Sequence, residues 1–332
     1  MWIFTGALIL FFVLELTYFK IANHFNIVDK PNLRSSHNQI TIRGGGIIFP
    51  LSIIIGILIW QHELWLLALA VLIIALISFL DDILTLNSKL RILIQFLAVL
   101  LLIYQVSLIT SSSSNLIFNS YSLFFIIIAV IFIIGIINAY NFMDGINGIT
   151  VIYSITTIIS IWFIQDHFGL ILLEESIYLL LIAAFIVFGF FNLRKKAKTF
   201  AGDIGSISVA FIISYLMLLL INYTQELKWM LLLGVYGLDA VATIFCRIIR
   251  KENIFDAHRT HFYQYLANEQ KWSHVLITII FSVFQILLNL VLIFTNHLLP
   301  VVCTYLIIIT IYIMARLRLE GKKRLFENYN NV

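Results

Sequence analysis

The stretch Asn138-Ala-Tyr-Asn141-Phe-Met-Asp144-Gly-Ile-Asn147-Gly-Ile149 joins two long apolar runs, residues 121–137 and 149–164. It gathers three amides and one carboxylate where the chain leaves one apolar run and enters the next. Its two glycines allow the backbone to approach a ligand closely. Crossing a bilayer requires no such cluster of polar groups. We therefore predict that this stretch forms one wall of a polar site.

The composition of the whole chain is that of a membrane protein. Hydrophobic residues make up 61% of it, charged residues 11%, and the mean hydropathy is +1.02, which excludes an ordinary soluble domain. Several apolar runs reach the ~20 helical residues needed to cross a hydrocarbon core about 30 Å thick. We predict one all-α, polytopic transmembrane domain over residues 1–332. Cys246 and Cys303 lie in different apolar runs and are expected to be unpaired packing residues.

Eleven transmembrane spans follow from the apolar runs. The first is expected to be retained, because no basic n-region or small-residue cleavage site marks it as a signal peptide. The predicted spans are residues 2–19, 44–60, 64–80, 92–109, 121–137, 149–164, 176–191, 206–223, 229–246, 274–295 and 299–315.

The basic residues orient these spans. Of the 21 lysines and arginines, 20 lie in the segment after Ala315 and in the connections 20–43, 81–91, 138–148, 192–205 and 247–273. By the positive-inside rule this face is cytoplasmic, with the N-terminus outside and the C-terminus inside. Because the basic residues are divided among these connections, we predict no nucleic-acid binding despite a pI of about 9.0.

Polar residues that suit catalysis gather on the predicted cytoplasmic face. The candidates are Arg43, Asp81, Asp82, Lys89, Arg91, Asn138, Asn141, Asp144, Asn147, Asp203, His258, Arg259 and His261. Simpler explanations exist for several of them. Asp81 and Asp82 could mark an interfacial helix end, and Asp203 could be a helix N-cap. His258 and His261 could share one face of an interfacial helix.

Four clustered carboxylates, those of Asp81, Asp82, Asp144 and Asp203, together indicate a metal ion. They meet one membrane boundary, where they repel one another and where burying a single charge costs a few kcal/mol. A divalent cation would remove that repulsion. Oxygen ligands suit Mg²⁺, with Mn²⁺ as an alternative, and Mg²⁺ commonly binds through one or two carboxylates plus substrate phosphates. Arg, His and Lys beside such a site suit a diphosphate. We predict an enzyme that joins a nucleotide-activated group to a lipid.

Five motifs occur in order on this face. They are Val28-Asp-Lys-Pro-Asn-Leu-Arg-Ser-Ser-His37 with Arg43-Gly-Gly-Gly46, Asp81-Asp82 with Lys89 and Arg91, Asn141-Phe-Met-Asp-Gly-Ile-Asn-Gly148, Phe200-Ala-Gly-Asp-Ile-Gly-Ser206, and His258-Arg-Thr-His261. This set covers most of the chain. It resembles the polyprenyl-phosphate N-acetylhexosamine-1-phosphate transferases, of the glycosyltransferase family 4 type, whose superfamily includes the phospho-MurNAc-pentapeptide translocase.

The resemblance implies transfer of a sugar 1-phosphate from a UDP-N-acetylhexosamine to undecaprenyl phosphate, with release of UMP and dependence on Mg²⁺. It implies metal ligands among Asp203, Asp144, Asn141 and Asp81, and leaves open which of Asp81 and Asp82 contacts the metal. His258 and His261 would act with Arg259 on phosphates. Substrate contacts would come from Arg43, Lys89, Arg91, Asn138, Asn141 and Asn147. A homodimer is also expected.

Two departures from the family pattern indicate which branch of the superfamily the chain resembles. The family often reads Asp-Gly-Ile-Asp where this chain has Asn147, although an amide can still pair with uracil. The chain also lacks the three consecutive histidines of the MurNAc-pentapeptide branch. It is more similar to enzymes that start O-antigen, capsule or teichoic-acid-type polysaccharides on a lipid carrier.

Three other functions fit the sequence less well. An intramembrane prenyltransferase would need a second Asp-rich motif, and a CDP-alcohol phosphotransferase would need an Arg soon after Asp144-Gly145. A transporter would place its polar groups near mid-membrane. Only Asp239 lies deep within a predicted span, where a functional role and a structural pairing are equally consistent with the sequence.

Overall fold

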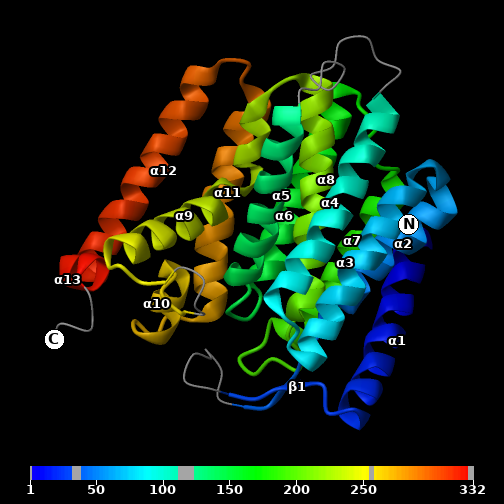
Figure 1. Ribbon diagram of the computed structural model, residues 1–332, viewed down its shortest axis with the longest axis horizontal. Coiled ribbons are helices and arrows are strands. Elements are labelled where there is room, and N and C mark those ends of the chain that lie inside the picture. The colour runs from blue at the N-terminus through cyan, green and yellow to red at the C-terminus, as the bar shows by residue number, and fades with distance from the viewer. Residues whose placement is uncertain (1, 32–38, 111–122, 254–257, 328–332) are drawn as a thin grey trace.

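The computed structural model describes residues 2–31, 39–110, 123–253 and 258–327. It is a bundle of long helices with one two-stranded antiparallel sheet at one end (Figure 1). The elements are α1 (Trp2–His24), β1 (Val28–Asp29), β2 (Thr41–Ile42), η1 (Gly45–Ile47), α2 (Ile48–Trp60), η2 (His62–Leu64), α3 (Trp65–Leu84), α4 (Ser88–Thr110), α5 (Leu123–Met143), α6 (Ile149–Phe168), α7 (Glu175–Asn192), α8 (Gly202–Thr224), η4 (Leu227–Leu233), α9 (Gly234–Ile249), α10 (Phe262–Asn268), α11 (His274–Phe294), α12 (Leu298–Leu319) and α13 (Gly321–Phe326).

Ten helical segments of the described chain, not eleven, are long and apolar enough to cross a membrane. The prediction of an all-α polytopic membrane protein is confirmed, but the predicted second span, residues 44–60, is shorter than these ten segments. That segment is the short helix Gly45–Trp60, which begins as a 3₁₀ turn. Its first glycines are used for close backbone contacts, described below, and not for a full-length span.

Helix α8 lies at the centre of the bundle and is buried on all sides. Its sequence is apolar around the whole circumference, as expected of a helix enclosed by others. Ser206, Ser208, Ala210 and Ser214 keep it slim, which allows neighbouring backbones to come close in a membrane protein. Helices α2, α3, α4, α5 and α6 pack around it. The first turn of α8 is therefore fixed at the end of the bundle where the sheet lies.

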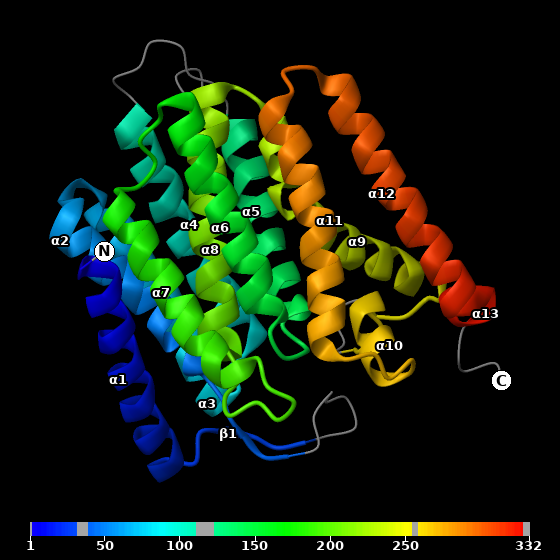
Figure 2. The ribbon, with the colours of Figure 1, turned by 180° about the vertical axis from the view of Figure 1, so that it is seen from behind.

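The short sheet is joined directly to the start of α8. Ile42 pairs with Thr199 in a parallel bridge, and the Phe200 N–H donates to the Ile42 carbonyl at 2.8 Å. The N–H groups of Gly45 and Gly46 donate to the carbonyls of Phe200 and Ala201 at 3.0 and 3.1 Å. This ladder places Arg43 beside Asp203. The connections between α3 and α4, α5 and α6, and α7 and α8 lie at the same end (Figure 2).

Gly46 and Gly205 let η1 and α8 touch through their backbones. A Cβ built on Gly46 would lie 2.4 Å from the Gly205 Cα, and one on Gly205 would lie 2.8 Å from the Gly46 Cα. Gly46→Ala is expected to lower the free energy of unfolding by about 2 kcal/mol, because backbone atoms cannot move aside as a side chain can. Thermal unfolding in detergent measures this. Gly135→Ala is the matched control, since no atom lies within 4 Å of its added Cβ. Equal melting temperatures for the two variants would contradict the close-contact role.

The ninth predicted span takes an unexpected form. It is divided into η4 and α9, and α9 is strongly inclined to its neighbours α11 and α12 in both views (Figures 1 and 2). Distance along α9 is therefore not depth in the membrane. Asp239 is fully buried between helices, and it lies close to the loop that carries the two histidines.

Candidate active site

The carboxylates at the end of α3 and the start of α8 are held by two arginines. Arg43 Nε lies 2.6 Å from Asp82 Oδ1, and Arg43 Nη2 lies 3.1 Å from Asp203 Oδ1. Arg91 pairs with Asp81, and its Nη1 lies 3.6 Å from Asp203 Oδ2. Asp203 thus sits between two guanidinium groups. The positive charge of these arginines offsets much of the repulsion between the carboxylates. From the sequence alone, a metal ion is expected to do this.

Asp82 caps helix α8 from a distant part of the chain. Its Oδ1 accepts the Asp203 N–H at 2.9 Å, and its Oδ2 accepts the Ile204 N–H at 3.1 Å. The capping role considered for Asp203 from the sequence therefore belongs to Asp82. The side chain of Asp82 is fully buried and bonded through both oxygens, whereas the Asp203 carboxylate remains partly accessible.

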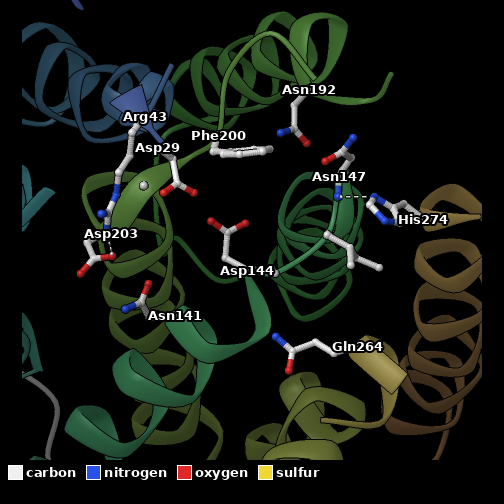
Figure 3. Close-up of a pocket in the computed structure, with 13 residues that line it drawn as sticks. Asp29, Arg43, Asn141, Asp144, Asn147, Asn192, Phe200, Asp203, Gln264 and His274 are labelled. Atoms are coloured by element: carbon white, nitrogen blue, oxygen red, sulfur yellow. Dashed lines mark hydrogen bonds and ion pairs between the residues drawn. The ribbon is translucent and has the colours of Figure 1, made fainter. Parts of the chain in front are cut away.

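A cavity of about 310 Å³ opens beside this cluster (Figure 3). Arg43, Asp203 and Asn141 lie on one side of it, and Asp144 points into the middle. Asp29, Phe200, Asn192, Asn147, His274 and Gln264 complete the wall. The cavity therefore has Asp29, Arg43 and Asp203 on one side and Asn147 and His274 on the other, and the Phe200 ring lies between Asp29 and Asn192 (Figure 3).

Asp144 is the carboxylate that projects furthest into the cavity. The Thr150 hydroxyl donates to its Oδ1, and this bond fixes the side chain at the start of α6. Burial raises the pKa of Asp144 to about 6; the bond from Thr150 opposes this rise, and the charge of Asp203 adds to it. Asn141, one turn earlier, accepts the Ser206 hydroxyl at 2.7 Å. Asp144, Asp203 and Asn141 thus converge on the cavity from the end of α5 and the start of α8. Asp81, the fourth predicted metal ligand, pairs with Arg91 outside the lining, and the metal-binding role of all four stays a prediction.

The residues present fit a Mg²⁺ ion that shares its coordination with a substrate. Among the described residues, no group of three or more His, Cys, Asp or Glu side chains is close enough to enclose a metal. Mg²⁺ needs no such cage, because it keeps waters and takes one or two carboxylates together with phosphate oxygens. Asp144 and Asp203 repel each other across the cavity and would supply two such ligands.

The far side of the cavity is organised by three connected residues. Asn147 donates its amide to the Arg194 carbonyl at 2.8 Å, and its backbone N–H donates to His274 Nδ1 at 3.2 Å. Asn192 accepts the Gly148 N–H at 2.6 Å and donates to the Thr199 carbonyl at 2.8 Å. These bonds tie the loop after α5 to the segment before α8.

The two predicted histidines lie outside the cavity lining. The rings of His258 and His261 stack at 5.0 Å, and both approach Phe142. Burial lowers the pKa of His258 to about 3 and also lowers the pKa of His261, although the nearby Asp239 opposes the second shift. Both rings are therefore neutral at pH 7. In this form they would contact a phosphate through hydrogen bonds and not through positive charge.

Four other predicted substrate contacts are also outside the lining, and one of them, Arg91, pairs with Asp81 as described above. Lys89 and Arg259 are exposed at the same end of the molecule. Asn138 donates its amide to the Ile134 carbonyl of its own helix at 2.8 Å. Their roles in binding remain predictions. The segment 32–37 of the first motif lies outside the described residues.

A buried polar network joins the histidine loop to α9 and α12. Asp239 accepts the Phe262 N–H at 2.9 Å and the Tyr312 hydroxyl at 2.8 Å. Arg316 donates to the Thr260 carbonyl at 3.2 Å and to the Tyr312 hydroxyl at 3.1 Å, and it pairs with Glu320. These contacts favour the structural pairing considered for Asp239, and through them α12 helps to fix the position of His261.

The sequence that forms much of this site is similar to that of a known protein family. A sequence profile of glycosyl transferase family 4 matches residues 64–221, from η2 through α8, and so includes all four clustered carboxylates. Over this range, just under half of the chain, the protein is similar to glycosyl transferase family 4. The match leaves out Arg43, Gln264 and His274, which line the cavity from outside that range.

Three relatives extend the similarity over most of the chain. A Bacillus subtilis protein named probable undecaprenyl-phosphate N-acetylglucosaminyl 1-phosphate transferase is 27% identical over 74% of this chain and 71% of its own length. A phospho-N-acetylmuramoyl-pentapeptide-transferase of Petrotoga mobilis is 29% identical over 79% of this chain and 85% of its own. A protein of the same name from Lactobacillus helveticus is 29% identical over 62% and 68%.

Sequence reasoning missed several residues that line the cavity. Asn192 ends an apolar helix, and Gln264 and His274 follow the expected histidine motif without belonging to it. An amide at the end of an apolar span, where the other candidate residues gather, is a usable signal, and it would have identified Asn192. His274 carries no such signal, because only the fold brings α11 against the loop after α5.

Arg316 offers a test of the network on α12. Arg316→Met is expected to lower the free energy of unfolding by about 3 kcal/mol, because it leaves buried acceptors and the Glu320 carboxylate without their partner. Arg318→Met is the matched control, since Arg318 lies on the same helix and is exposed. Thermal unfolding in detergent compares the two. If Arg316→Met melts with Arg318→Met, the network does not stabilise the fold.

Proposed function

We propose that this protein transfers N-acetylhexosamine 1-phosphate from a UDP-sugar to undecaprenyl phosphate at the cytoplasmic face of the bacterial inner membrane. UMP is released, and the product starts a lipid-linked cell-surface polysaccharide. The observation that carries the proposal is the divided cavity. One side has Arg43 and Asp203, with Arg91 behind Asp203 and Asp144 in the middle of the cavity, for a diphosphate and its cation. The other side has amides and an imidazole for a nucleoside (Figure 3). The names of the relatives support the same reaction.

The reaction proceeds by one exchange of bonds at the sugar-linked phosphorus. An oxygen of the lipid phosphate forms a bond to this phosphorus, the bond to the bridging oxygen breaks, and UMP leaves with that oxygen. A lipid phosphate has a second pKa near 6, so it is largely ionised at pH 7 and needs little help from a general base. This favours a role for Asp81 and Asp82 in positioning: Asp81 holds Arg91, and Asp82 holds Arg43.

The side chains of the cavity hold and orient the substrates. Arg43 and Arg91 reach Asp203 from opposite sides and are suited to place phosphate oxygens beside it. Mg²⁺, held by Asp144 and Asp203 with Asn141 nearby, would offset the charge of the diphosphate. Phe200 offers its ring to the base, and Asn147 and Asn192 fix the loops around it.

The test uses purified protein in detergent with undecaprenyl phosphate, Mg²⁺ and a panel of UDP-N-acetylhexosamines. We expect UMP release with one sugar, loss of release on adding EDTA, and recovery with added Mg²⁺ or Mn²⁺. A lipid-diphosphate-sugar product should accumulate in parallel. Release of UDP would show that the sugar moves without its phosphate, and the proposed mechanism would then be wrong.

A further inference from the structure

His274 reaches the cavity from a part of the chain outside all five sequence motifs. It is the first residue of α11, whose end is fixed by Ser273, since Ser273 Oγ accepts the Leu276 N–H at 3.2 Å. Helix α11 is held against α6 by the Tyr153 hydroxyl, which donates to Gln285 Oε1 at 2.5 Å. The imidazole therefore projects from a rigid helix end. It lies on the side of the cavity away from Arg43 and Asp203 (Figure 3).

The two nitrogens of this ring have different surroundings. Nδ1 accepts the backbone N–H of Asn147 at 3.2 Å, so it carries no proton. In the neutral ring the proton is then on Nε2, which becomes a donor. Among the residues that the structure describes, Nε2 makes no hydrogen bond, and the half-buried side chain leaves it accessible. A donor fixed in direction and without a protein acceptor thus lines the cavity.

We infer that His274 is a substrate-binding residue whose Nε2–H donates to a carbonyl oxygen of the pyrimidine base. This inference rests on the proposed function, because it takes the ligand to be a uridine nucleotide. Arg43 and Asp203 assign the diphosphate to the opposite side of the cavity, which leaves the base beside His274 and Asn147, with the Phe200 ring between the two sides (Figure 3). Uracil offers two carbonyl oxygens. The amides of Asn147 and Asn192 are already bonded to backbone groups, whereas Nε2 has its full capacity for the ligand.

Two substitutions separate the two ring nitrogens. In His274→Asn the short amide carries an oxygen near the place of Nδ1, so the bond from the Asn147 N–H is kept and the donor to the cavity is lost. In His274→Gln the longer side chain carries an amide N–H near the place of Nε2, so the donor is kept. We expect His274→Asn to bind UMP about fivefold more weakly than the wild-type protein, the effect of one uncharged hydrogen bond. His274→Gln should bind within twofold of wild type.

The measurement is calorimetric titration of the detergent-purified protein with UMP and with 2′-deoxy-UMP. Lys271→Ala, an exposed change three residues earlier, is the matched control and should leave both affinities unchanged. For a contact to the base, His274→Asn weakens both nucleotides equally. Weakening of UMP alone would assign His274 to the ribose and overturn the inference. Equal losses in the Asn and Gln variants, or none in the Asn variant, would also overturn it.

The wild-type protein separates this inference from the proposed function. If wild type releases UMP from a UDP-sugar and His274→Asn binds UMP normally, the inference fails and the reaction stands. If wild type neither binds UMP nor releases it, the proposed reaction fails, and the inference fails with it.

Discussion

Asp203→Asn is expected to lower the rate of UMP release by about a hundredfold or more while leaving the protein folded. The substitution keeps the size of the side chain and removes the charge that faces Arg43, Arg91 and the proposed Mg²⁺. Loss of one group that stabilises charge in a transition state typically costs 10²- to 10³-fold in rate. The start of α8 should survive, because Asp82 binds the backbone N–H of Asp203 and not its carboxylate.

The experiment compares initial rates of UMP release at equal protein amounts, with melting temperature as the measure of folding. Asp166→Asn is the matched control, because it makes the same chemical change at an exposed position near the far end of α6. It should keep both the rate and the melting temperature. Full turnover by Asp203→Asn would remove Asp203 from the active site.

Asp82→Ala is expected to have the largest effect on stability, about 4 kcal/mol in the free energy of unfolding. It removes the partner of Arg43 Nε and leaves the N–H groups of Asp203 and Ile204 without an acceptor. Breaking a buried charged pair costs about 3–5 kcal/mol, and each buried unsatisfied donor adds to the loss. Asp82→Asn, which keeps one acceptor oxygen, should fall between Asp82→Ala and the wild-type protein.

Thermal unfolding and chemical denaturation in detergent measure this effect, with Asp166→Asn again as control. The two predictions distinguish roles within one cluster: Asp203 variants lose rate at constant stability, and Asp82 variants lose stability first. If Asp82→Ala kept its melting temperature and lost turnover as Asp203→Asn does, Asp82 would be a ligand and not a cap.

Much of the fold could be predicted from the sequence because a bilayer imposes few choices. Apolar runs of about 20 residues must become helices, and the described helices follow the predicted spans closely for α3, α6 and α8. The exceptions have local causes. Gly45–Trp60 is short because its apolar run lies between Arg43 and Gln61, and α9 is inclined where η4 interrupts the ninth apolar run.

The site was harder to predict because its energetics depend on distant partners. The pattern around Asp81, Asp82 and Asp203 indicates repulsion, and only the fold shows that Arg43 and Arg91 sit between these carboxylates. The convergence of Asp144, Asp203 and Asn141 on one cavity follows the sequence motifs. The positions of Asn192 and His274 in the cavity wall do not follow from those motifs, because they depend on how α7 and α11 pack.

The cap on α8 decides how an anion can be held in this protein. The free N–H groups and dipole of a helix N-terminus form a ready site for phosphate. Here a protein carboxylate, Asp82, already occupies two of those N–H groups, so substrate phosphates are excluded from them. In the proposed reaction, diphosphate recognition is therefore left to the guanidinium groups of Arg43 and Arg91 and to the proposed Mg²⁺. Such contacts are screened by dissolved salt, so nucleotide affinity should fall as ionic strength rises.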